Sequence, residues 1–200
     1  SSCTGALHLI LLGLGIKKGD EVIVPDMTWV ATASVVKYVG ATPVFADIDA
    51  SLNLDPEAIK VQITSKTKAI IFVGVGGNSA NLQEVIEIAR ENDIKIILDA
   101  AHMSGSKIDG RHVGFDVDVT VFSYQAVKNL PTADSGMICF SDEKLDKRAR
   151  QLSWLGINKD TYQRSDKNSY KWDYNVASVG YKYHGNSIME KVLIINPKAK

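Results

Sequence analysis

The chain has 200 residues, of which 45% are hydrophobic and 23% are charged, a balance typical of a globular protein. Its 23 Lys and Arg side chains are matched by 23 Asp and Glu, so no net charge attracts nucleic acid or an anionic membrane. No apolar run approaches the ~20 residues that a membrane-spanning helix requires. The chain begins without Met and without the features of a signal peptide, and we expect it to be part of a longer protein.

The histidines and cysteines give no sign of a metal site. Cys3 and Cys139 are far apart and outside any CxxC spacing, which disfavours a disulfide scaffold and a structural zinc site. The four histidines show no ligand-like spacing either. We therefore expect no metal, and a reducing cytoplasm as the location.

Strand-like and helix-like segments alternate along the chain. Apolar runs predict strands at 21–25, 42–48, 68–75, 93–100 and 118–123, and helical patterns lie at 5–16, 28–40, 55–64 and 81–94. Asp55 and Pro56 are an N-cap and first-turn proline for the third of these helices. Several strands are continuous apolar runs, which are typical of strands buried on both faces. The pattern predicts an α/β fold of three layers, with helices on both faces of a mostly parallel sheet.

Two charged residues lie at the predicted ends of buried strands. Asp99 follows an apolar run, and Lys128 comes shortly after the strand that ends at Ser123. Ligands of parallel α/β sheets bind beyond the carboxyl ends of the strands, so both side chains are candidates for a binding site. A structural ion pair is the alternative explanation.

Two further segments favour a binding site. The run from Ser1 to Gly5 leads small polar residues into an apolar helix, whose free N–H groups and dipole can bind a phosphate. A plain N-cap is the alternative there. Trp29 lies beside Thr28 and small alanines, which leaves room for a flat ring to stack on the indole, although a core tryptophan would look the same.

Together these pieces match the needs of pyridoxal 5′-phosphate. Its phosphate requires an anchor, its ring requires a platform, its pyridine nitrogen requires a carboxylate, and its aldehyde forms a Schiff base with a lysine. The sequence therefore predicts pyridoxal phosphate as cofactor.

The chain resembles the DegT/DnrJ/EryC1/StrS aminotransferases, sugar aminotransferases of the type I pyridoxal-phosphate fold. The resemblance runs from about residue 2 to 190 through five blocks in order: SCTGALHL, GDEVIVPDMTWVATASVVKYVGATPVFADID, LDAAHMSGS, FSYQAVKNL and WDYNVASVGYKYHGNSI. Any one block is weak evidence, but five in order are specific.

The resemblance implies roles for individual residues. Lys128 matches the lysine that holds the cofactor, and Ser123 matches a serine that contacts its phosphate. Asp99 matches the partner of the pyridine nitrogen, and His102 matches a group near the ring hydroxyl.

The remaining blocks add a phosphate site and a partner subunit. Thr4 and Gly5 match the phosphate-binding stretch, and Trp29 matches the aromatic that stacks on the ring. In the family, polar side chains of the last block reach the cofactor phosphate of a neighbouring subunit. Asn186 is the candidate here, with Lys182 and His184 as weaker ones, so we expect a homodimer with shared active sites.

Some features depart from the family pattern. Cys3 stands where glycine is usual and could crowd the phosphate loop, and Gly185 replaces a methionine. The tail from Glu190 departs from the alanine-rich helix expected after Ile188. We expect residues 1–156 to form the cofactor-binding large domain, with its N-terminal part missing. Residues 157–200 would be a loop and the start of a region leading to an absent C-terminal small domain.

The expected activity is transfer of an amino group, from glutamate, to a keto-sugar linked to a nucleotide, as in polysaccharide biosynthesis. Two alternatives stand beside it. Some relatives are sugar dehydratases, in which histidine replaces the lysine, and Lys128 argues against that reading. The other alternative is a non-catalytic or truncated relative.

Overall fold

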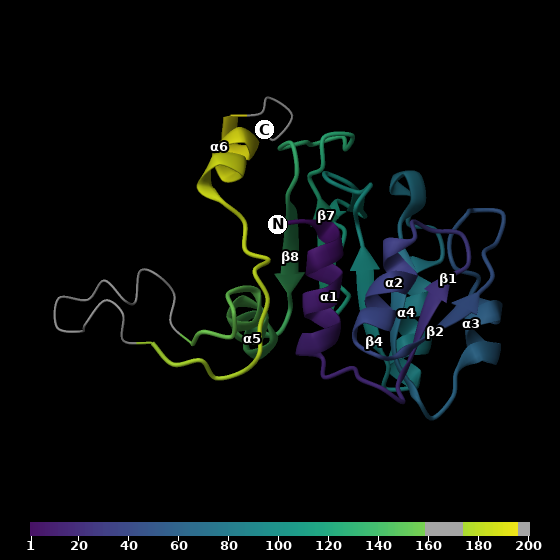
Figure 1. Ribbon diagram of the computed structural model, residues 1–200. Helices are drawn as coiled ribbons and strands as arrows, with labels where there is room; N and C mark the ends of the chain where they lie inside the picture. Colours follow the sequence, from purple (N-terminus) through teal and green to yellow (C-terminus); the bar gives the residue numbers. More distant parts are fainter. Residues whose placement is uncertain (159–173, 196–200) are drawn as a thin grey trace.

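The computed structural model describes residues 1–158 and 174–195, and its centre is a six-stranded sheet between helices (Figure 1). The strand order is β2-β1-β3-β4-β7-β8. Neighbouring strands run parallel except at the β7–β8 pair, which is antiparallel. This arrangement confirms the predicted α/β class and the mostly parallel sheet.

The strands of this sheet are β1 (Glu21–Pro25), β2 (Thr42–Ala46), β3 (Thr67–Val73), β4 (Lys95–Asp99), β7 (Val119–Ser123) and β8 (Gly136–Phe140). The α-helices are α1 (Cys3–Gly13), α2 (Ala31–Tyr38), α3 (Pro56–Gln62), α4 (Leu82–Glu91), α5 (Glu143–Ser153) and α6 (Ser187–Ile195). Shorter elements are the 3-10 turn η1 (Val75–Gly77) and the hairpin strands β5 (Lys107–Ile108) and β6 (Arg111–His112).

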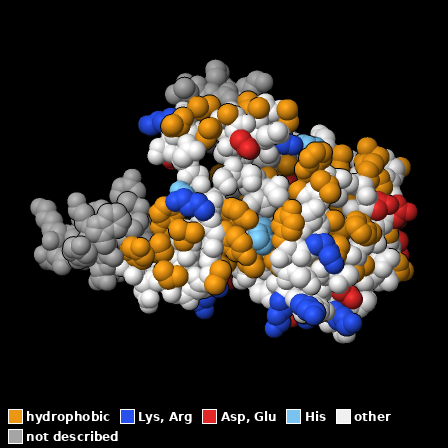
Figure 2. Space-filling model, in the orientation of Figure 1, with side chains coloured by type: hydrophobic (Ala, Val, Ile, Leu, Met, Phe, Trp, Pro, Cys, Tyr) orange, Lys and Arg blue, Asp and Glu red, His pale blue; other side chains and the backbone are white. Residues whose placement is uncertain are grey.

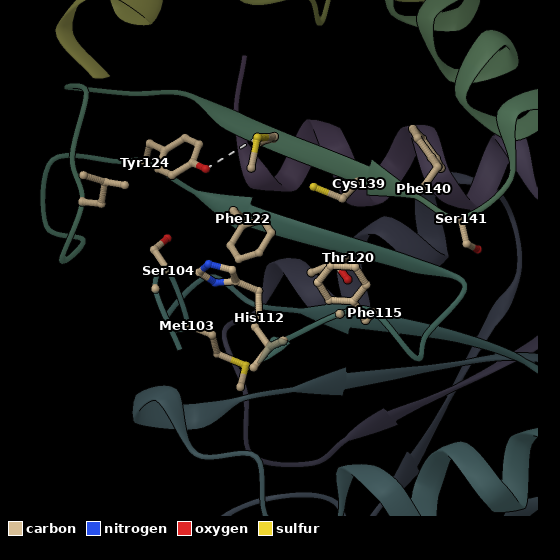
Figure 3. Close-up of a pocket in the computed structure, with 15 residues that line it drawn as sticks. Met103, Ser104, His112, Phe115, Thr120, Phe122, Tyr124, Cys139, Phe140 and Ser141 are labelled. Carbon is tan, nitrogen blue, oxygen red and sulfur yellow. Dashed lines mark hydrogen bonds between the residues drawn. The ribbon is translucent and has the colours of Figure 1, made fainter. Parts of the chain in front are cut away.

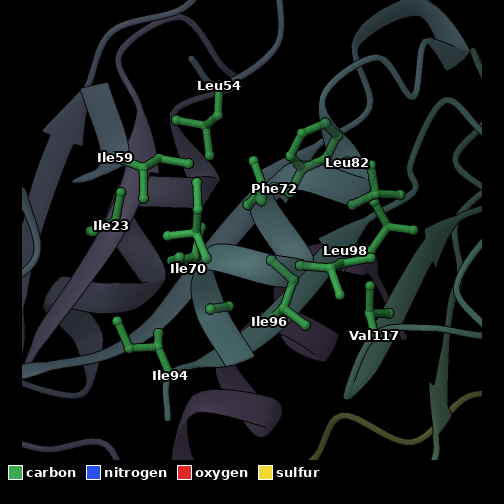
Figure 4. Packing of buried hydrophobic residues seen from close by; sticks show 14 of the residues in the cluster. Ile23, Leu54, Ile59, Ile70, Phe72, Leu82, Ile94, Ile96, Leu98 and Val117 are labelled. Carbon is green, nitrogen blue, oxygen red and sulfur yellow. The ribbon is translucent and has the colours of Figure 1, made fainter. Parts of the chain in front are cut away.

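Consecutive residues of the central strands belong to two different cores. Phe72 packs with Leu82 of α4 and Ile59 of α3 on one face of the sheet (Figure 4). Its neighbour Ile71 packs with Leu7 of α1 on the other face, in a cluster that also contains residues of α2. Alternation of side chains along a strand explains this split, and burial of each such side chain contributes about 1.5–3 kcal/mol. Both faces are therefore covered, which confirms the three layers.

The helix starts are fixed by local sequence. Asp55 Oδ1 accepts a hydrogen bond from the N–H of Glu57 at 2.9 Å, as the Asp-Pro signal predicts. In α1 the hydroxyl of Ser2 accepts from the N–H of Gly5 at 3.1 Å. The four helices and five strands expected from the sequence all form, as α1 to α4 and as β1, β2, β3, β4 and β7. Their ends differ from the predicted ranges by a few residues.

Beyond the expected pattern, the structure contains η1, β5, β6, β8, α5 and α6. β8 pairs with β7 from Gly136 to Phe140, and its short apolar run at 137–140 was not assigned to a strand. α6 forms over Ser187–Ile195, although its sequence departs from the alanine-rich helix expected there. Met, Leu, Glu and Lys support a helix about as well as most residues, so alanine is not required there.

The chain after α5 returns along α1. Ile157 bridges Val176, and Trp154 bridges Lys182 in a second antiparallel bridge. Within the segment 157–200, expected to be a loop and the start of a further region, residues 159–173 and 196–200 lie outside the described residues. Within the described ranges, no helix combines the length and apolarity needed to cross a membrane.

Candidate active site

A cavity of about 680 Å³ lies where β3, β4 and β7 end and α1 begins. Its volume falls within the roughly 300–1,000 Å³ of small-molecule sites. Six of the eight residues expected to form the site line it, namely Thr4, Trp29, Asp99, His102, Ser123 and Lys128. Gly5 and Asn186 do not line it.

Neighbouring strands bring the buried polar groups of the cavity together. Asp99 ends β4 and is in register with Val121 of β7, so Ser123 lies two residues further along the adjacent strand. Asp99 is only 7% exposed and Ser123 only 4%. Lys128 follows in the loop after β7, where its N–H donates to the carbonyl of Gln125 at 2.9 Å. The sheet thus delivers a carboxylate, a hydroxyl and an amine to one opening.

The carboxylate of Asp99 is held by donors on one of its oxygens. Its Oδ1 accepts from the N–H of Ala101 at 3.0 Å and from the thiol of Cys3 at 3.7 Å. Burial raises the pKa of Asp99, while these two donors and the positive charge of Lys128 oppose that rise. Both hydrogen bonds go to Oδ1, so Oδ2 is the oxygen that remains to face a ligand.

His102 is a neutral side chain with a defined tautomer. Burial, and secondly the charge of Lys128, lowers the pKa of His102 below its usual value. The N–H of Gly76 donates to Nδ1 at 3.2 Å, so Nδ1 carries the lone pair and the proton is on Nε2. The turn that holds Gly76 is the glycine-rich segment after β3, and Gly76 adopts φ +61° there. His102 therefore offers one donor to the cavity.

Fewer groups are available to bind a phosphate at the start of α1 than the sequence suggested. Cys3 and Thr4 are in the first turn, where helix geometry provides no acceptor for their N–H groups. The N–H of Gly5 is already used by Ser2. A Cβ at Gly5 would lie 3.4 Å from the ring of Tyr183, so the structure places Gly5 against the returning chain and outside the cavity.

Gly136 positions this helix start, and our sequence reasoning missed it. A Cβ added at Gly136 would lie 2.5 Å from the carbonyl carbon of Ser2 and 2.7 Å from the nitrogen of Cys3. Only glycine lets β8 approach the first turn of α1 this closely. A glycine in a strand often marks a close backbone approach, and that signal could have identified the residue.

Trp29 lies at the mouth of the cavity with its side chain 77% exposed. This exposure excludes the alternative of a core tryptophan. Met27, Val30 and Val127 are exposed as well, and two of them, Met27 and Val127, line the same cavity. The mouth thus carries an apolar rim above the buried polar floor.

The last family block lies away from the cavity of its own chain. The ammonium of Lys182 is 3.5 Å from the centre of the Trp154 ring, and the ring of His184 meets Trp154 edge-on at 4.2 Å. Asn186 caps α6, because its Oδ1 accepts from the N–H groups of Ile188 and Met189 at 3.1 Å each.

A second cavity, of about 620 Å³, lies on the other face of β7 and β8 (Figure 3). Thr120 and Phe122 of β7 point into it, as does Cys139 of β8. Within the described chain, the hydroxyl oxygens of Thr120 and Ser104 have no hydrogen-bond partner. It shares no lining residue with the cavity of Lys128.

Residues 1–190 match the model of the DegT/DnrJ/EryC1/StrS aminotransferase family. The chain belongs to this family. It is 40% identical over 183 residues to the spore coat polysaccharide biosynthesis protein SpsC of Bacillus subtilis, covering 91% of this chain and 47% of SpsC. The chain thus spans about half the length of the curated relatives it matches.

Solved structures of aminotransferases share the fold. The aminotransferase TlmJ of Streptoalloteichus hindustanus superposes with a TM-score of 0.87 at 32% identity, over 98% of this chain and 50% of TlmJ. Spr1654 of Streptococcus pneumoniae, in its form with pyridoxamine phosphate, gives a TM-score of 0.88 at 34% identity, over 97% and 54% of the two chains. A form of Spr1654 with pyridoxal phosphate also matches. The family is pyridoxal-phosphate-dependent, and the fold is that of the type I enzymes, as predicted.

Proposed function

We propose that this chain provides the cofactor-binding part of an aminotransferase that moves an amino group from glutamate to a nucleotide-linked keto-sugar. The observation that carries the proposal is the convergence of Lys128, Asp99, Ser123 and Thr4 on one cavity. The family match supports the reaction class. The names of relatives such as SpsC support a role in polysaccharide biosynthesis.

The residues present fit pyridoxal phosphate. Among the described residues, Asp99 Oδ2 has no hydrogen-bond donor, and Lys128 supplies a nearby positive charge, which suits the carboxylate to pair with a protonated ring nitrogen. The Nε2–H of His102 suits the ring hydroxyl. Ser123 and the first turn of α1 at Thr4 suit the phosphate, because a hydroxyl and unpaired N–H groups bind anions. Trp29 suits the face of the ring at the cavity mouth.

Each side chain has a chemical task in such a reaction. When bound, the cofactor supplies an aldehyde for covalent capture of amines and a ring that withdraws electrons from the reacting carbon. Lys128 would hold the cofactor at its aldehyde through the side-chain amine, and the same amine would carry a proton to and from the substrate carbon. Asp99 holds a proton on the ring nitrogen. Trp29 and the apolar rim limit the access of water.

The apolar rim also supports a homodimer. Met27, Trp29 and Val127 are large exposed hydrophobic side chains that line the cavity mouth. On the face shown in Figure 2, hydrophobic side chains reach the surface in many places, whereas several basic side chains gather along the lower edge. In such a homodimer, Asn186 would reach the cofactor phosphate of the neighbouring copy, as the family resemblance implies. The cytoplasm remains the proposed location.

Reductive trapping tests the cofactor assignment. The protein is incubated with pyridoxal phosphate, reduced with borohydride and digested, and the modified peptide is identified by mass spectrometry. We expect a pyridoxyl group on Lys128. The matched controls are Lys128→Ala, which should carry none, and Lys107→Ala, which alters an exposed lysine outside the cavity and should be modified as the wild type.

A second experiment tests the reaction. Glutamate is supplied with a nucleotide-linked keto-sugar or with the free keto-sugar, and the 2-oxoglutarate released is measured. Turnover with the nucleotide-linked sugar supports the full proposal. Turnover with the free sugar alone would show that the substrate carries no nucleotide. A trapped Lys128 without turnover on either would favour the non-catalytic alternative. Label scattered over surface lysines, with Lys128 unmodified in folded protein, would overturn the cofactor assignment.

A further inference from the structure

Cys3 occupies a position where the family usually has glycine, and the structure shows where its side chain goes. Cys3 is the first residue of α1 and lines the cavity of Lys128. It is not among the residues with positive φ, so no glycine conformation is required at this position. The expected crowding of the phosphate loop therefore does not arise from the backbone.

The thiol of Cys3 points to the carboxylate of Asp99, a residue 96 positions away in the sequence. Its Sγ lies 3.7 Å from Oδ1, within hydrogen-bond range for sulfur. The same oxygen also accepts from the N–H of Ala101. Both donors bind Oδ1, which restrains the rotation of the carboxylate and leaves Oδ2 without a hydrogen bond among the described residues.

The proton of this contact belongs to the thiol. Burial, and then the neighbouring charge of Asp99, raises the pKa of Cys3 well above its usual range, so the side chain is a protonated donor at neutral pH. The contact in turn acts on the acid, because a donated hydrogen bond lowers the pKa of Asp99 against the effect of burial. The sulfur is a poor nucleophile in this state, since the thiolate is the reactive form.

We propose that Cys3 is a positioning residue that orients the Asp99 carboxylate and stabilises its ionised form for the ring nitrogen of the cofactor. The inference rests on the proposed function, since it assigns Asp99 to that nitrogen. It adds a donor that a glycine at the same position does not provide.

Thiol reactivity tests the contact in cofactor-free protein. The rates at which iodoacetamide modifies Cys3 and Cys139 are measured on their separate peptides at one alkaline pH. Asp99→Asn removes the neighbouring charge, so the pKa of Cys3 should fall and its rate should rise. We expect about a threefold increase for each pKa unit, because a less basic thiolate is also less nucleophilic.

Two controls distinguish an effect of the Asp99 charge on the Cys3 thiol from a change in the access of iodoacetamide to it. Cys139 is exposed and lines the second cavity, so its rate should not change in Asp99→Asn. Ser123→Ala alters the wall of the first cavity but keeps the Asp99 charge, and it should leave the rate of Cys3 unchanged. An unchanged rate of Cys3 in Asp99→Asn, or an equal rise in Ser123→Ala, would overturn the proposal.

Cofactor binding provides the second readout. Cys3→Ala removes the donor and keeps the Cβ, whereas Cys3→Ser keeps a donor. We expect a Kd for pyridoxal phosphate about tenfold higher in Cys3→Ala, which corresponds to about 1.4 kcal/mol, and a value near that of the wild type in Cys3→Ser. Equal Kd values in Cys3→Ala and the wild type would refute the role of the thiol.

The two proposals fail in different ways. If Lys128 is trapped but the Cys3 variants and the wild type have the same Kd for pyridoxal phosphate, the cofactor assignment stands and the proposed role of Cys3 is wrong. If Lys128 is not trapped while the alkylation rates respond to Asp99→Asn, the thiol–carboxylate contact exists but does not serve this cofactor.

Discussion

The two cavities on either side of β7 have similar volumes, about 680 and 620 Å³, and very different linings. The first collects the ends of three parallel strands and the start of a helix, so charged and polar groups converge in it. The second lies against the flat side of β7 and β8, where aromatic and aliphatic side chains dominate. The topology of the sheet, and not the size of a hollow, therefore marks the reactive site.

The consecutive residues Phe122 and Ser123 show the same contrast between the two cavities. The side chain of Ser123 opens into the first cavity, and that of Phe122 opens into the second. Alternation along the strand separates them to opposite faces of the sheet. Substitutions in the first cavity should change cofactor chemistry, whereas those in the second should change only stability.

The largest effect is expected from Lys128. Lys128→Arg keeps a positive charge near Asp99 and His102 but cannot capture an aldehyde or exchange a proton at neutral pH. Reductive trapping should be abolished, and turnover should fall by at least about 10²–10⁴-fold, the range for a lost acid–base group. Trapping that persists at the same peptide in Lys128→Arg would disprove the role.

Asp99→Asn should have the next largest effect. The amide cannot hold a proton on the ring nitrogen, so turnover should fall by about 10²–10³-fold, the typical loss for one electrostatic contact in a transition state. We expect the cofactor to remain bound through Lys128 and the phosphate contacts, which trapping would verify. Turnover near that of the wild type in this variant would contradict the assignment of Asp99 to the ring nitrogen.

Ser123→Ala should have a moderate effect. It removes one hydroxyl donor to the phosphate, and hydrogen bonds to charged groups contribute about 1.5–3 kcal/mol. The Kd for pyridoxal phosphate should rise by about tenfold or more, with little change in the denaturation midpoint. Titration of the cofactor followed by fluorescence checks the first value, and urea unfolding checks the second.

Phe122→Ala should have no effect on the cofactor and a measurable one on folding. Phe122 is half-buried against the core under α4, so its loss should cost about 2–3 kcal/mol of unfolding free energy. The Kd for pyridoxal phosphate should equal that of the wild type. A weakened Kd in Phe122→Ala together with an unchanged one in Ser123→Ala would reverse the comparison of the two cavities.

Most of the fold could be predicted from the sequence because the central strands are continuous apolar runs between capped helices. The same pattern places Asp99 and Lys128 at strand ends, which is enough to suggest a shared site. β8 was not predicted because its apolar run at 137–140 is only four residues long, and short runs do not by themselves distinguish a strand from other structure. The use of the Gly5 N–H by Ser2 and the contact of Cys3 with Asp99 depend on three-dimensional approach, which local sequence does not record.

Gly136 gives the cavity a fixed length. It lets the start of α1 rest on β8, while Lys128 is carried by the loop that leaves the paired strand β7. The distance between an anion bound at one end and a carbon captured at the other is therefore set by a hydrogen-bonded pair of strands. The paired strands thus set the distance between the two ends of the cavity, so a ligand must have a matching length between its anionic group and its reactive carbon.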